Sequence, residues 1–492
     1  MSDVNLNSLV MKVARRAENA PADVLRDSFV PVRSLLAHLE SAEHHVLFGR
    51  RGTGKTHLLR YLQDRKAAEG GLAIYLDLRK VGSPGDLVPG AAGGFCEQAT
   101  GLLVAVLEHI YNGVYEQVLD DRWAARLDGI SVGLDGLAQA AKQVRVVAPA
   151  GGEEPAEPAR ESYHVVVGPL PAAVQTLASA LAPHELWILI DEWSALPPDL
   201  QPLMAELLRR TFFATSGVVV KISAIHGRSR FSDVPESGPP IGLELGADTA
   251  ASLDLDDFLL FRNDVAATLD FYAALLFRHL SAMVARSDRA EQAAVRGIDT
   301  PQRLIGQLFT APQSFHNLVL GAEGVPRDAL QIAGLAAGAT YRHRIGPMQV
   351  ATATRDFFLR DKEGNIPRSA QRVFTNLIEQ CARQQSRIIP LRRDGESNEE
   401  TIQRLYDARL IHRVRHGVSL DPQHPAEVYD VYVIDYGCFL GLLESGRIRT
   451  LQDGLDPGAR FADANEIEIR ARSFVRLPTG WYRPRERVKR RP

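Results

Sequence analysis

The chain has 492 residues, enough for about three domains of ordinary size. Hydrophobic residues make up 45% of it and charged residues 24%, which is the composition of a globular protein with an apolar core. A formal net charge of −3 argues against a nucleic-acid binder that is basic throughout. The charge is uneven, because residues 470–492 carry nine Lys or Arg side chains and one acidic side chain.

Cysteine usage and hydropathy indicate the compartment. The only cysteines are Cys96, Cys381 and Cys438, far apart and without the spacing of a zinc site, which favours a reducing environment. Residues 1–20 carry charges throughout and lack the apolar core of a signal peptide. The longest charge-poor stretch, residues 165–183, is interrupted by Gly, Pro and polar residues, so it cannot form an uninterrupted membrane span. We expect a cytoplasmic protein with no membrane partner.

Residues 1–44 open the chain with a charged, helical pattern. We interpret them as a leader element of the domain that follows, because their apolar residues can pack beside its first strand. These apolar residues are Val24, Phe29, Val30, Val32, Leu35, Leu36 and Leu39.

The stretch from Gly49 to Thr56, GRRGTGKT, fits the phosphate-binding pattern G-x-x-x-x-G-K-[ST] in full. A short apolar run precedes it as a buried strand would, and a helical stripe of leucines follows it. Glycines let such a loop turn its N–H groups toward phosphates. The residues expected to bind the nucleotide are Gly49, Gly52, Thr53, Gly54, Lys55 and Thr56.

The last two residues of this pattern have separate roles. Lys55 can reach the β- and γ-phosphates as a point charge, and the Thr56 hydroxyl can bind Mg²⁺. The alternative is a chance glycine-rich turn between a strand and a helix. Because every position of the pattern is filled between a strand and a helix, the sequence predicts a nucleoside triphosphate and Mg²⁺ as ligands.

Residues 72–78 predict a second buried strand, of the kind found in parallel sheets. The next segment, residues 82–165, is interpreted as an insertion between core strands. It opens with a Gly- and Pro-rich stretch at 82–94, expected to be a mobile loop, and contains a predicted helix at 102–118. Near its end, the acidic, low-complexity stretch 147–160 is expected to be disordered.

A second nucleotide-binding signature follows. A helix is predicted at 171–181 and a continuous apolar strand at 186–190, and Asp191 and Glu192 come directly after it. A carboxylate at the C-terminal tip of a buried parallel strand lies next to the phosphate-binding loop, so Asp191 can hold Mg²⁺ directly or through water. Glu192 is placed to orient and deprotonate an attacking water. The alternative is an ordinary acidic strand end.

A helix at 202–211 and strands at 217–225 and 253–256 complete the predicted sheet. Ser223, near the end of the first of these strands, can contact the γ-phosphate or the attacking water, or can be satisfied within the sheet. The order of elements predicts an α/β fold, a three-layer sandwich in which helices cover both faces of a parallel sheet.

The segment after this sheet is predicted to be largely helical, with helices at 258–284, 299–309, 314–320 and 327–337. In the stretch GVPR, Pro326 and Arg327 open the last of these helices. The guanidinium of Arg327 can reach back over a bound phosphate, or Arg327 can be an ordinary first-turn arginine.

In this order and spacing, GRRGTGKT, WILIDE, the KIS strand end and GVPR resemble the motifs of the AAA+ ATPases. Within that family the chain looks most similar to the origin-recognition (initiator) type and its bacterial relatives, over residues 40–340. The resemblance implies ATP hydrolysis, with Lys55 and Thr56 in the Walker A motif. It implies Asp191 and Glu192 in the Walker B motif.

The resemblance also implies two sensors and an arginine finger. Ser223 takes the sensor-1 position, where Asn or Thr is more usual, and Arg327 takes the sensor-2 position on a helical lid. The arginine finger, which acts on a neighbouring subunit's nucleotide, is implied at Arg210, with Arg209 and Arg228 as alternatives. A homo-oligomer or another protein partner is therefore expected. The implied layout is an ATPase core at 1–257, with the insertion 82–165 that the family does not usually carry, and a lid at 258–340.

The remaining elements resemble a winged-helix domain, the C-terminal partner of origin-recognition ATPases, at residues 341–445. They are a linking helix at 341–361, a helix at 367–380, a strand at 387–391, a helix at 398–408 and two strands at 410–417 and 428–434. In such a domain the third helix would enter a DNA major groove. Its outward Gln403 and Arg404 are accompanied by Glu399, Glu400 and Asp407, so protein binding is nearly as good an interpretation.

The tail, residues 446–492, is the better nucleic-acid candidate, because Phe474, Trp481 and Tyr482 are interleaved with its arginines. The alternative is a solvated segment, or one docked on an acidic protein face. The expected function is an ATP-driven switch that assembles on DNA and is reset by hydrolysis. The other interpretation is a signalling or defence ATPase, similar to the STAND-type relatives of this family, whose winged helix binds protein.

Overall fold

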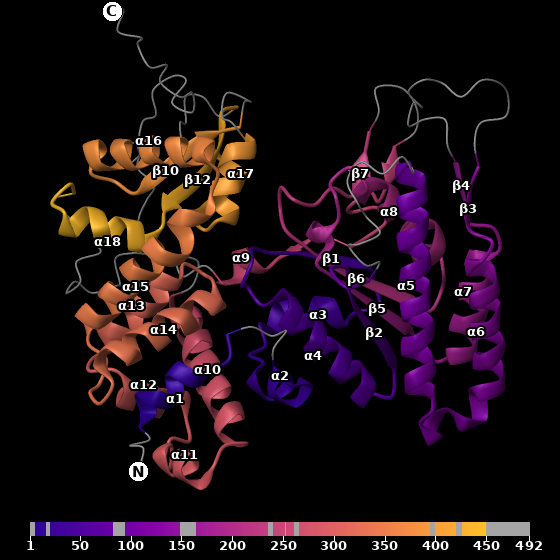
Figure 1. Cartoon of the computed structure of the whole chain (residues 1–492), viewed down its shortest axis with the longest axis horizontal. Helices are drawn as coiled ribbons and strands as arrows, with labels where there is room; N and C mark the ends of the chain where they lie inside the picture. Colours follow the sequence, from indigo (N-terminus) through magenta and orange to yellow (C-terminus); the bar gives the residue numbers. More distant parts are fainter. Residues whose placement is uncertain are drawn as a thin grey trace, which may run out of the picture. The chain divides into compact units, whose positions relative to one another are not determined.

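The structure is a computed structural model of the chain. It describes residues 5–15, 20–81, 94–147, 164–234, 240–250, 252–259, 265–393, 399–419 and 426–448. Contacts divide the chain into two compact units (Figure 1). We call residues 31–49 and 55–255 the sheet unit, and residues 1–30, 50–54 and 256–492 the helical unit.

The sheet unit is built on five parallel strands in the order β2-β5-β6-β1-β9. Their bounds are β1 His45–Phe48, β2 Leu72–Asp77, β5 Leu186–Asp191, β6 Val218–Ala224 and β9 Leu253–Asp254. All five predicted strands are present, although β9 has two residues and a helix begins directly after it. In this order β6 separates the strand before the phosphate-binding loop from the strand that ends in Asp191.

Helices cover both faces of this sheet. On β2, Tyr75 faces α4 (Lys55–Ala68), because the guanidinium of Arg60 lies 3.6 Å from the centre of its ring. The adjacent Ile74 points to the other face, because side chains alternate along a strand. There it packs against Gly113 of α5 (Phe95–Val118), where an added Cβ would lie 2.9 Å from Ile74 Cδ1. The predicted three-layer α/β arrangement is confirmed.

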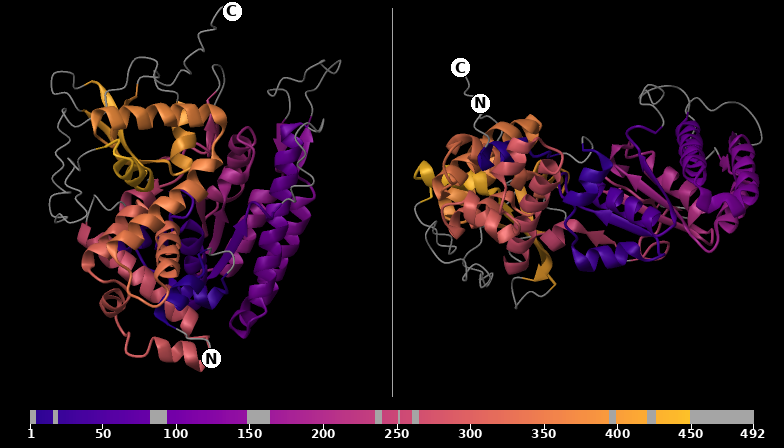
Figure 2. Two further views of the ribbon diagram at one scale, coloured as in Figure 1. Left: turned by 60° about the vertical axis from the view of Figure 1, so that its left-hand side comes forward. Right: turned by 90° about the horizontal axis from the view of Figure 1, so that it is seen from below.

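The described part of the segment predicted as an insertion, residues 82–165, contains more helix than its sequence indicated. Helix α5 starts seven residues before the predicted 102–118, and α6 (Leu127–Ala141) was not predicted. Helix α6 packs along α7 (Leu170–Leu181), and strands β3 (Arg145–Val147) and β4 (His164–Val166) form an antiparallel pair (Figure 2). The expected loop at 82–94 and the expected disordered stretch at 147–160 lie almost wholly outside the described residues.

Shorter elements complete the sheet unit. They are α3 Arg33–Glu40, η2 Asp121–Arg126, η4 Trp193–Ala195, α8 Gln201–Leu208, the π-helix η5 Arg209–Phe213, β7 Ser232–Asp233 and β8 Ile241–Gly242.

Among its described residues, the helical unit has a large hydrophobic core that runs from Leu9 to Ile448, and a smaller one formed by Ile388, Val431 and Val433 of the C-terminal sheet. Its helices before residue 366 are α1 Leu6–Lys12, α2 Ala22–Ser28, α9 Leu255–Leu259, α10 Val265–Val284, α11 Arg289–Ala294, α12 Pro301–Leu308, α13 Pro312–Ala322, α14 Pro326–Thr340, α15 Pro347–Phe357, η6 Phe358–Lys362 and η7 Glu363–Asn365. Helix α1 packs on α14 and α2 packs on α10, so residues 1–30 belong with these helices. This differs from the expectation that residues 1–44 form a single leader beside the first strand.

The C-terminal elements follow the predicted order of helix, strand, helix and two strands. They are α16 Arg368–Gln384, β10 Ile388–Arg392, α17 Glu399–Asp407, β11 Ile411–Ser419 and β12 Val428–Ile434, followed by α18 Tyr436–Glu444, which was not predicted. The strands form an antiparallel sheet in the order β10-β12-β11. The predicted linking helix begins at Pro347 rather than at residue 341.

The basic tail from residue 449 onward lies outside the described residues. Within the described part of the chain, none of the helices has the length and apolar character needed to cross a membrane.

Candidate functional site

In the sheet unit, polar groups from several elements surround Asp191 at the end of β5. The Thr56 hydroxyl, in the first turn of α4, donates a hydrogen bond of 2.7 Å to Asp191 Oδ2. The Ser223 hydroxyl, near the end of β6, donates to Asp191 Oδ1, and the Glu192 amide donates to the same oxygen at 3.0 Å. A threonine and a carboxylate 135 positions apart in the chain thus lie together, as their sequence patterns predicted.

Ser223 is fully buried, and its oxygen also accepts a bond of 3.2 Å from the Glu192 amide. Its hydroxyl is thus engaged within the sheet in this structure, where it orients the Asp191 carboxylate.

Tyr75 is a member of this cluster that the sequence did not single out. Its hydroxyl donates a bond of 2.7 Å to Asp191 Oδ2 from the neighbouring strand β2. Burial and the nearby Asp191 carboxylate raise the pKa of Tyr75 well above its usual value, so the phenol stays protonated and remains a donor. In the sequence, the only sign of this role was the polar hydroxyl of Tyr75 within a mostly apolar predicted strand.

Lys55 is buried, and its Nζ donates a bond of 2.6 Å to the carbonyl oxygen of Gly49, at the start of the same loop. The ammonium group is therefore held beside the first residue of the phosphate-binding pattern. A compact cation in this place is suited to phosphate oxygens.

Glu192 follows β5 in the left-handed conformation, with φ 60° and ψ 42°. One carboxylate oxygen lies 3.6 Å from Nη1 of Arg79, a residue that sequence reasoning missed. Arg79 also makes a bond of 2.7 Å to Asp77, which stands beside Asp191 in the sheet register. Burial alone would raise the pKa of Asp77, but its hydrogen bonds from Arg79 lower it, so this pair stays charged.

The apex of the loop, residues 50–54, belongs to the helical unit. The Arg327 amide, in the first turn of α14, donates a bond of 3.2 Å to the Gly52 carbonyl. A Cβ added at Gly52, where φ is +93°, would lie 3.0 Å from both Arg327 Cβ and Val325 Cγ1. Only glycine therefore fits this position without strain. Arg327 thus contacts the apex of the loop through its backbone amide and the base of its side chain, and its action as sensor 2 stays a prediction.

The candidate arginine fingers lie in the sheet unit. The side chains of Arg209 and Arg210 both bond to Glu206, Arg209 at 2.8 Å and Arg210 at 2.5 Å. Arg210 is the more exposed, with 61% of its side chain accessible. Arg228 is also exposed. Their action on a neighbouring subunit stays a prediction.

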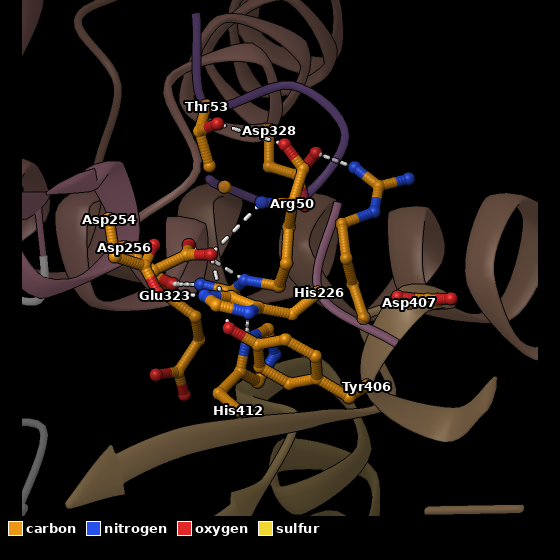
Figure 3. A network of polar contacts seen from close by, with 12 residues as sticks. Arg50, Thr53, His226, Asp254, Asp256, Glu323, Asp328, Tyr406, Asp407 and His412 are labelled. Atoms are coloured by element: carbon orange, nitrogen blue, oxygen red, sulfur yellow. Dashed lines mark hydrogen bonds and ion pairs between the residues drawn. The ribbon is translucent and has the colours of Figure 1, made fainter. Parts of the chain in front are cut away.

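Arg50, inside the loop, was not singled out by the sequence. It is buried in the helical unit among Asp256, Tyr406 and His412 (Figure 3). The Thr53 hydroxyl donates a bond of 2.8 Å to the Arg50 carbonyl oxygen, which closes a turn within the loop.

The groups in the sheet unit fit a nucleotide bound with Mg²⁺. Hydroxyl and carboxylate oxygens are the ligands that this hard cation prefers, and Thr56 and Asp191 provide one of each. Lys55 provides the positive charge for phosphates. The residues present therefore match the predicted cofactors in their chemistry.

The helix expected to read DNA, α17, has the predicted apolar face, since Ile402, Leu405 and Tyr406 are buried. Its polar side chains bond to each other: Gln403 donates to Asp407 at 3.0 Å, and Arg404 pairs with Glu400. Asp407 is buried rather than on the outward face. The outward face of α17 therefore offers little positive charge that is not already paired with a carboxylate.

Comparisons with known proteins place the loop in a family context. Residues 13–68, which include the phosphate-binding loop, match a family model described as ORC-CDC6-like. Among solved structures, the chain is similar to that of the Aeropyrum pernix ORC1 protein in complex with DNA, at 13% sequence identity and a TM-score of 0.29. That match covers 90% of this chain and 97% of the other. No curated protein matches the sequence. Over residues 13–68, the chain is thus similar to the ORC-CDC6-like family.

Proposed function

We propose that this protein is an ATP-dependent switch of the AAA+ type, related to the origin-recognition proteins, that binds and slowly hydrolyses ATP. The observation that carries the proposal is the contact between Thr56 and Asp191, 2.7 Å apart beside the phosphate-binding loop. The family match over residues 13–68 supports it.

Within this proposal the residues have separate roles. Lys55 binds the phosphates, and the amides of the loop glycines Gly49, Gly52 and Gly54 donate to them. Thr56 and Asp191 would hold Mg²⁺, which supplies neutralisation of phosphate charge when bound. Ser223 and Tyr75 keep the Asp191 carboxylate in one orientation through their hydroxyl bonds.

Hydrolysis requires a base, and Glu192 takes this role in the proposal because it follows Asp191 and has a partly exposed carboxylate. Its ion pair with Arg79 holds the carboxylate in one place, from which it can accept a proton from a water. Arg327 and an arginine of a neighbouring subunit, Arg210 in the first instance, would stabilise charge that develops on the phosphates.

We further propose that ATP controls assembly on DNA, with a core at 1–257, a lid at 258–340, a winged helix at 341–445 and a basic tail. Residues 1–30 of this core pack on helices α10 and α14 of the lid. A signalling or defence ATPase is the second candidate. A specific observation favours it, namely that Arg404 and Gln403 on α17 are already engaged by Glu400 and Asp407. Such a face is better suited to protein than to a phosphate backbone.

The test is DNA retention measured by fluorescence anisotropy, with and without ATP, at about 50 and 200 mM salt. Retention that needs ATP and falls steeply with salt supports assembly on DNA. Lys55→Ala is the matched control, because removal of a charge-assisted hydrogen bond should weaken ATP binding by about 1.5–3 kcal/mol. Wild-type ATP affinity in Lys55→Ala would contradict the nucleotide site. ATP binding without any DNA retention would favour the signalling candidate.

A further inference from the structure

Arg50 is an unusual residue for a phosphate-binding loop, because its side chain is turned away from solvent and only 1% of the residue is exposed. Its Nε donates a bond of 2.8 Å to Asp256 Oδ1, and its backbone amide donates a bond of 3.0 Å to Asp256 Oδ2. One carboxylate thus fixes both the backbone and the side chain of Arg50. The Tyr406 hydroxyl donates to the same carboxylate at 3.1 Å, and the guanidinium lies 5.0 Å from the Tyr406 ring centre.

The other end of the guanidinium reaches the C-terminal sheet (Figure 3). Arg50 Nη1 bonds to Nδ1 of His412 on β11, and Nη2 donates a bond of 3.1 Å to the Glu323 carbonyl at the end of α13. Because a guanidinium can only donate, His412 must accept through Nδ1. The proton of the neutral imidazole is then on Nε2.

This tautomer fits the other contact of His412. Its Nε2 lies 2.9 Å from Asp435 Oδ2, and this carboxylate also receives a bond of 2.7 Å from Lys362. Burial lowers the pKa of His412 in spite of Asp435, so the ring is neutral and its two roles are stable. Arg50 is therefore tied to the C-terminal sheet through a histidine that is itself oriented.

Fixing Arg50 also fixes the loop. The Arg50 carbonyl oxygen accepts the Thr53 hydroxyl at 2.8 Å, and it accepts the Thr53 amide at 3.4 Å. The intervening Gly52 is packed against the start of α14. The position of Arg50 thus sets the conformation of residues 50–53.

We propose that His412 and Asp256 are positioning residues for residues 50–53 of the phosphate-binding loop. They act through Arg50, by holding it in the one conformation from which the loop is shaped. The inference rests on the proposed function, because it assigns the purpose of this arrangement to nucleotide binding.

The first experiment measures hydrogen exchange of the loop amides in the protein without nucleotide. His412→Leu removes the acceptor for Arg50, so the amides of residues 50–54 should exchange about tenfold faster. His412→Asn, whose side-chain carbonyl oxygen lies near the place of Nδ1, should restore slow exchange. Ile389→Ala is the matched control, because it weakens the same sheet from a buried position on β10 with an apolar side chain that cannot bond to Arg50.

Loop exchange that is unchanged in His412→Leu would overturn the proposal, as would equal acceleration in Ile389→Ala, since the effect would then be general destabilisation.

The second experiment measures ATP affinity of the same variants by fluorescence of a labelled nucleotide. We expect His412→Leu to bind about tenfold more weakly, with recovery in His412→Asn. Unchanged affinity in His412→Leu would overturn the positioning role. If the wild-type protein binds no ATP, the proposed function fails, whereas the exchange experiment still decides whether the C-terminal sheet sets the loop conformation.

Discussion

At the scale of single residues, Asp191 shows how one carboxylate can be prepared for a cation. Hydroxyls from Thr56, Tyr75 and Ser223 and an amide from Glu192 all point at its two oxygens. Donors from the strands on either side and from a helix therefore hold the carboxylate in one orientation. Glu192, the next residue, keeps a partly exposed carboxylate in a long ion pair of 3.6 Å with Arg79.

Glu192→Gln should therefore separate nucleotide binding from turnover. The amide preserves the shape of the side chain but cannot accept a proton from water, so hydrolysis should fall by roughly 10²-fold or more while ATP stays bound. Phosphate release and nucleotide affinity, measured on the same preparation, check this. Hydrolysis at the wild-type rate would exclude Glu192 as the base.

The buried lysine Lys221 has a structural role. Lys221 on β6 is fully buried, and its Nζ donates to the Ser41 and Glu43 carbonyls at 2.9 and 2.6 Å. Burial, opposed by the nearby Glu43 and assisted by Lys66, lowers the pKa of Lys221 to about 7. Between about pH 7 and 10, the unfolded chain keeps a proton on this lysine that the folded protein has released.

The contribution of Lys221 to stability should thus rise with pH over this window. Lys221→Met removes this contribution. The difference in the free energy of unfolding, variant minus wild type, should therefore decrease as the pH rises from about 7 to about 9. The limiting slope is about 1.4 kcal/mol per pH unit. Urea unfolding at several pH values measures it. Val219→Ala, a buried apolar neighbour on β6, is the control and should give a difference independent of pH. A flat result for Lys221→Met would show that the ammonium stays charged when buried.

At the scale of elements, the packing of α6 on α7 depends on one glycine. A Cβ at Gly133 would lie 2.8 Å from the Leu177 Cα, which is main chain and cannot move without shifting the helix. At Gly136, one turn further along α6, the nearest atom would be the Ala173 Cβ at 4.0 Å. The two helices therefore approach more closely at Gly133 than at Gly136.

Gly133→Ala should destabilise the protein by about 1–3 kcal/mol, because the backbones of α6 and α7 must separate. Gly136→Ala, on the same helix, should stabilise it by up to about 1 kcal/mol, because alanine is the better helix former and the space is open. Thermal and urea unfolding of the two variants measure this. Similar effects of both substitutions would show that close packing at Gly133 is not the determining contact.

At the scale of the whole molecule, charge is concentrated at one end of the sequence. Residues 470–492 gather nine cations against one acidic residue, in a chain with a net charge of −3. On α17, by contrast, Arg404 is paired with Glu400. The tail rather than the helix is therefore expected to contribute most of any affinity for nucleic acid.

Deleting residues 470–492 should weaken DNA binding strongly and flatten its salt dependence, by roughly 0.9 log unit per log of salt for each phosphate that the tail neutralises. ATP hydrolysis without DNA should change little, because Lys55 and Glu192 are far away in sequence. Anisotropy titrations at several salt concentrations and a phosphate-release assay check both expectations. If the truncated protein binds DNA with the same slope, residues 1–469 carry the contact.

What the sequence determined by itself is local in origin. The glycine pattern of residues 49–56, the apolar run of 186–190 and the two acids after it each occupy a few consecutive positions, and their spacing predicted the strands, the loop and the parallel α/β sheet. The meeting of Thr56 with Asp191 also followed, because the carboxyl ends of parallel strands lie at one edge.

The tertiary structure alone decided contacts between distant residues that no periodicity encodes. Tyr75 has the sequence context of one more member of a buried strand, yet its hydroxyl bonds to Asp191. Arg50 has the context of a solvent-exposed loop residue, yet it bonds to His412, 362 positions away. Residues 1–30 joined the helical unit because their apolar faces fit α10 and α14, a matter of shape that hydropathy cannot express. Sequence patterns specify which face of an element is apolar, whereas the partner of that face is chosen by packing among all the elements of the fold.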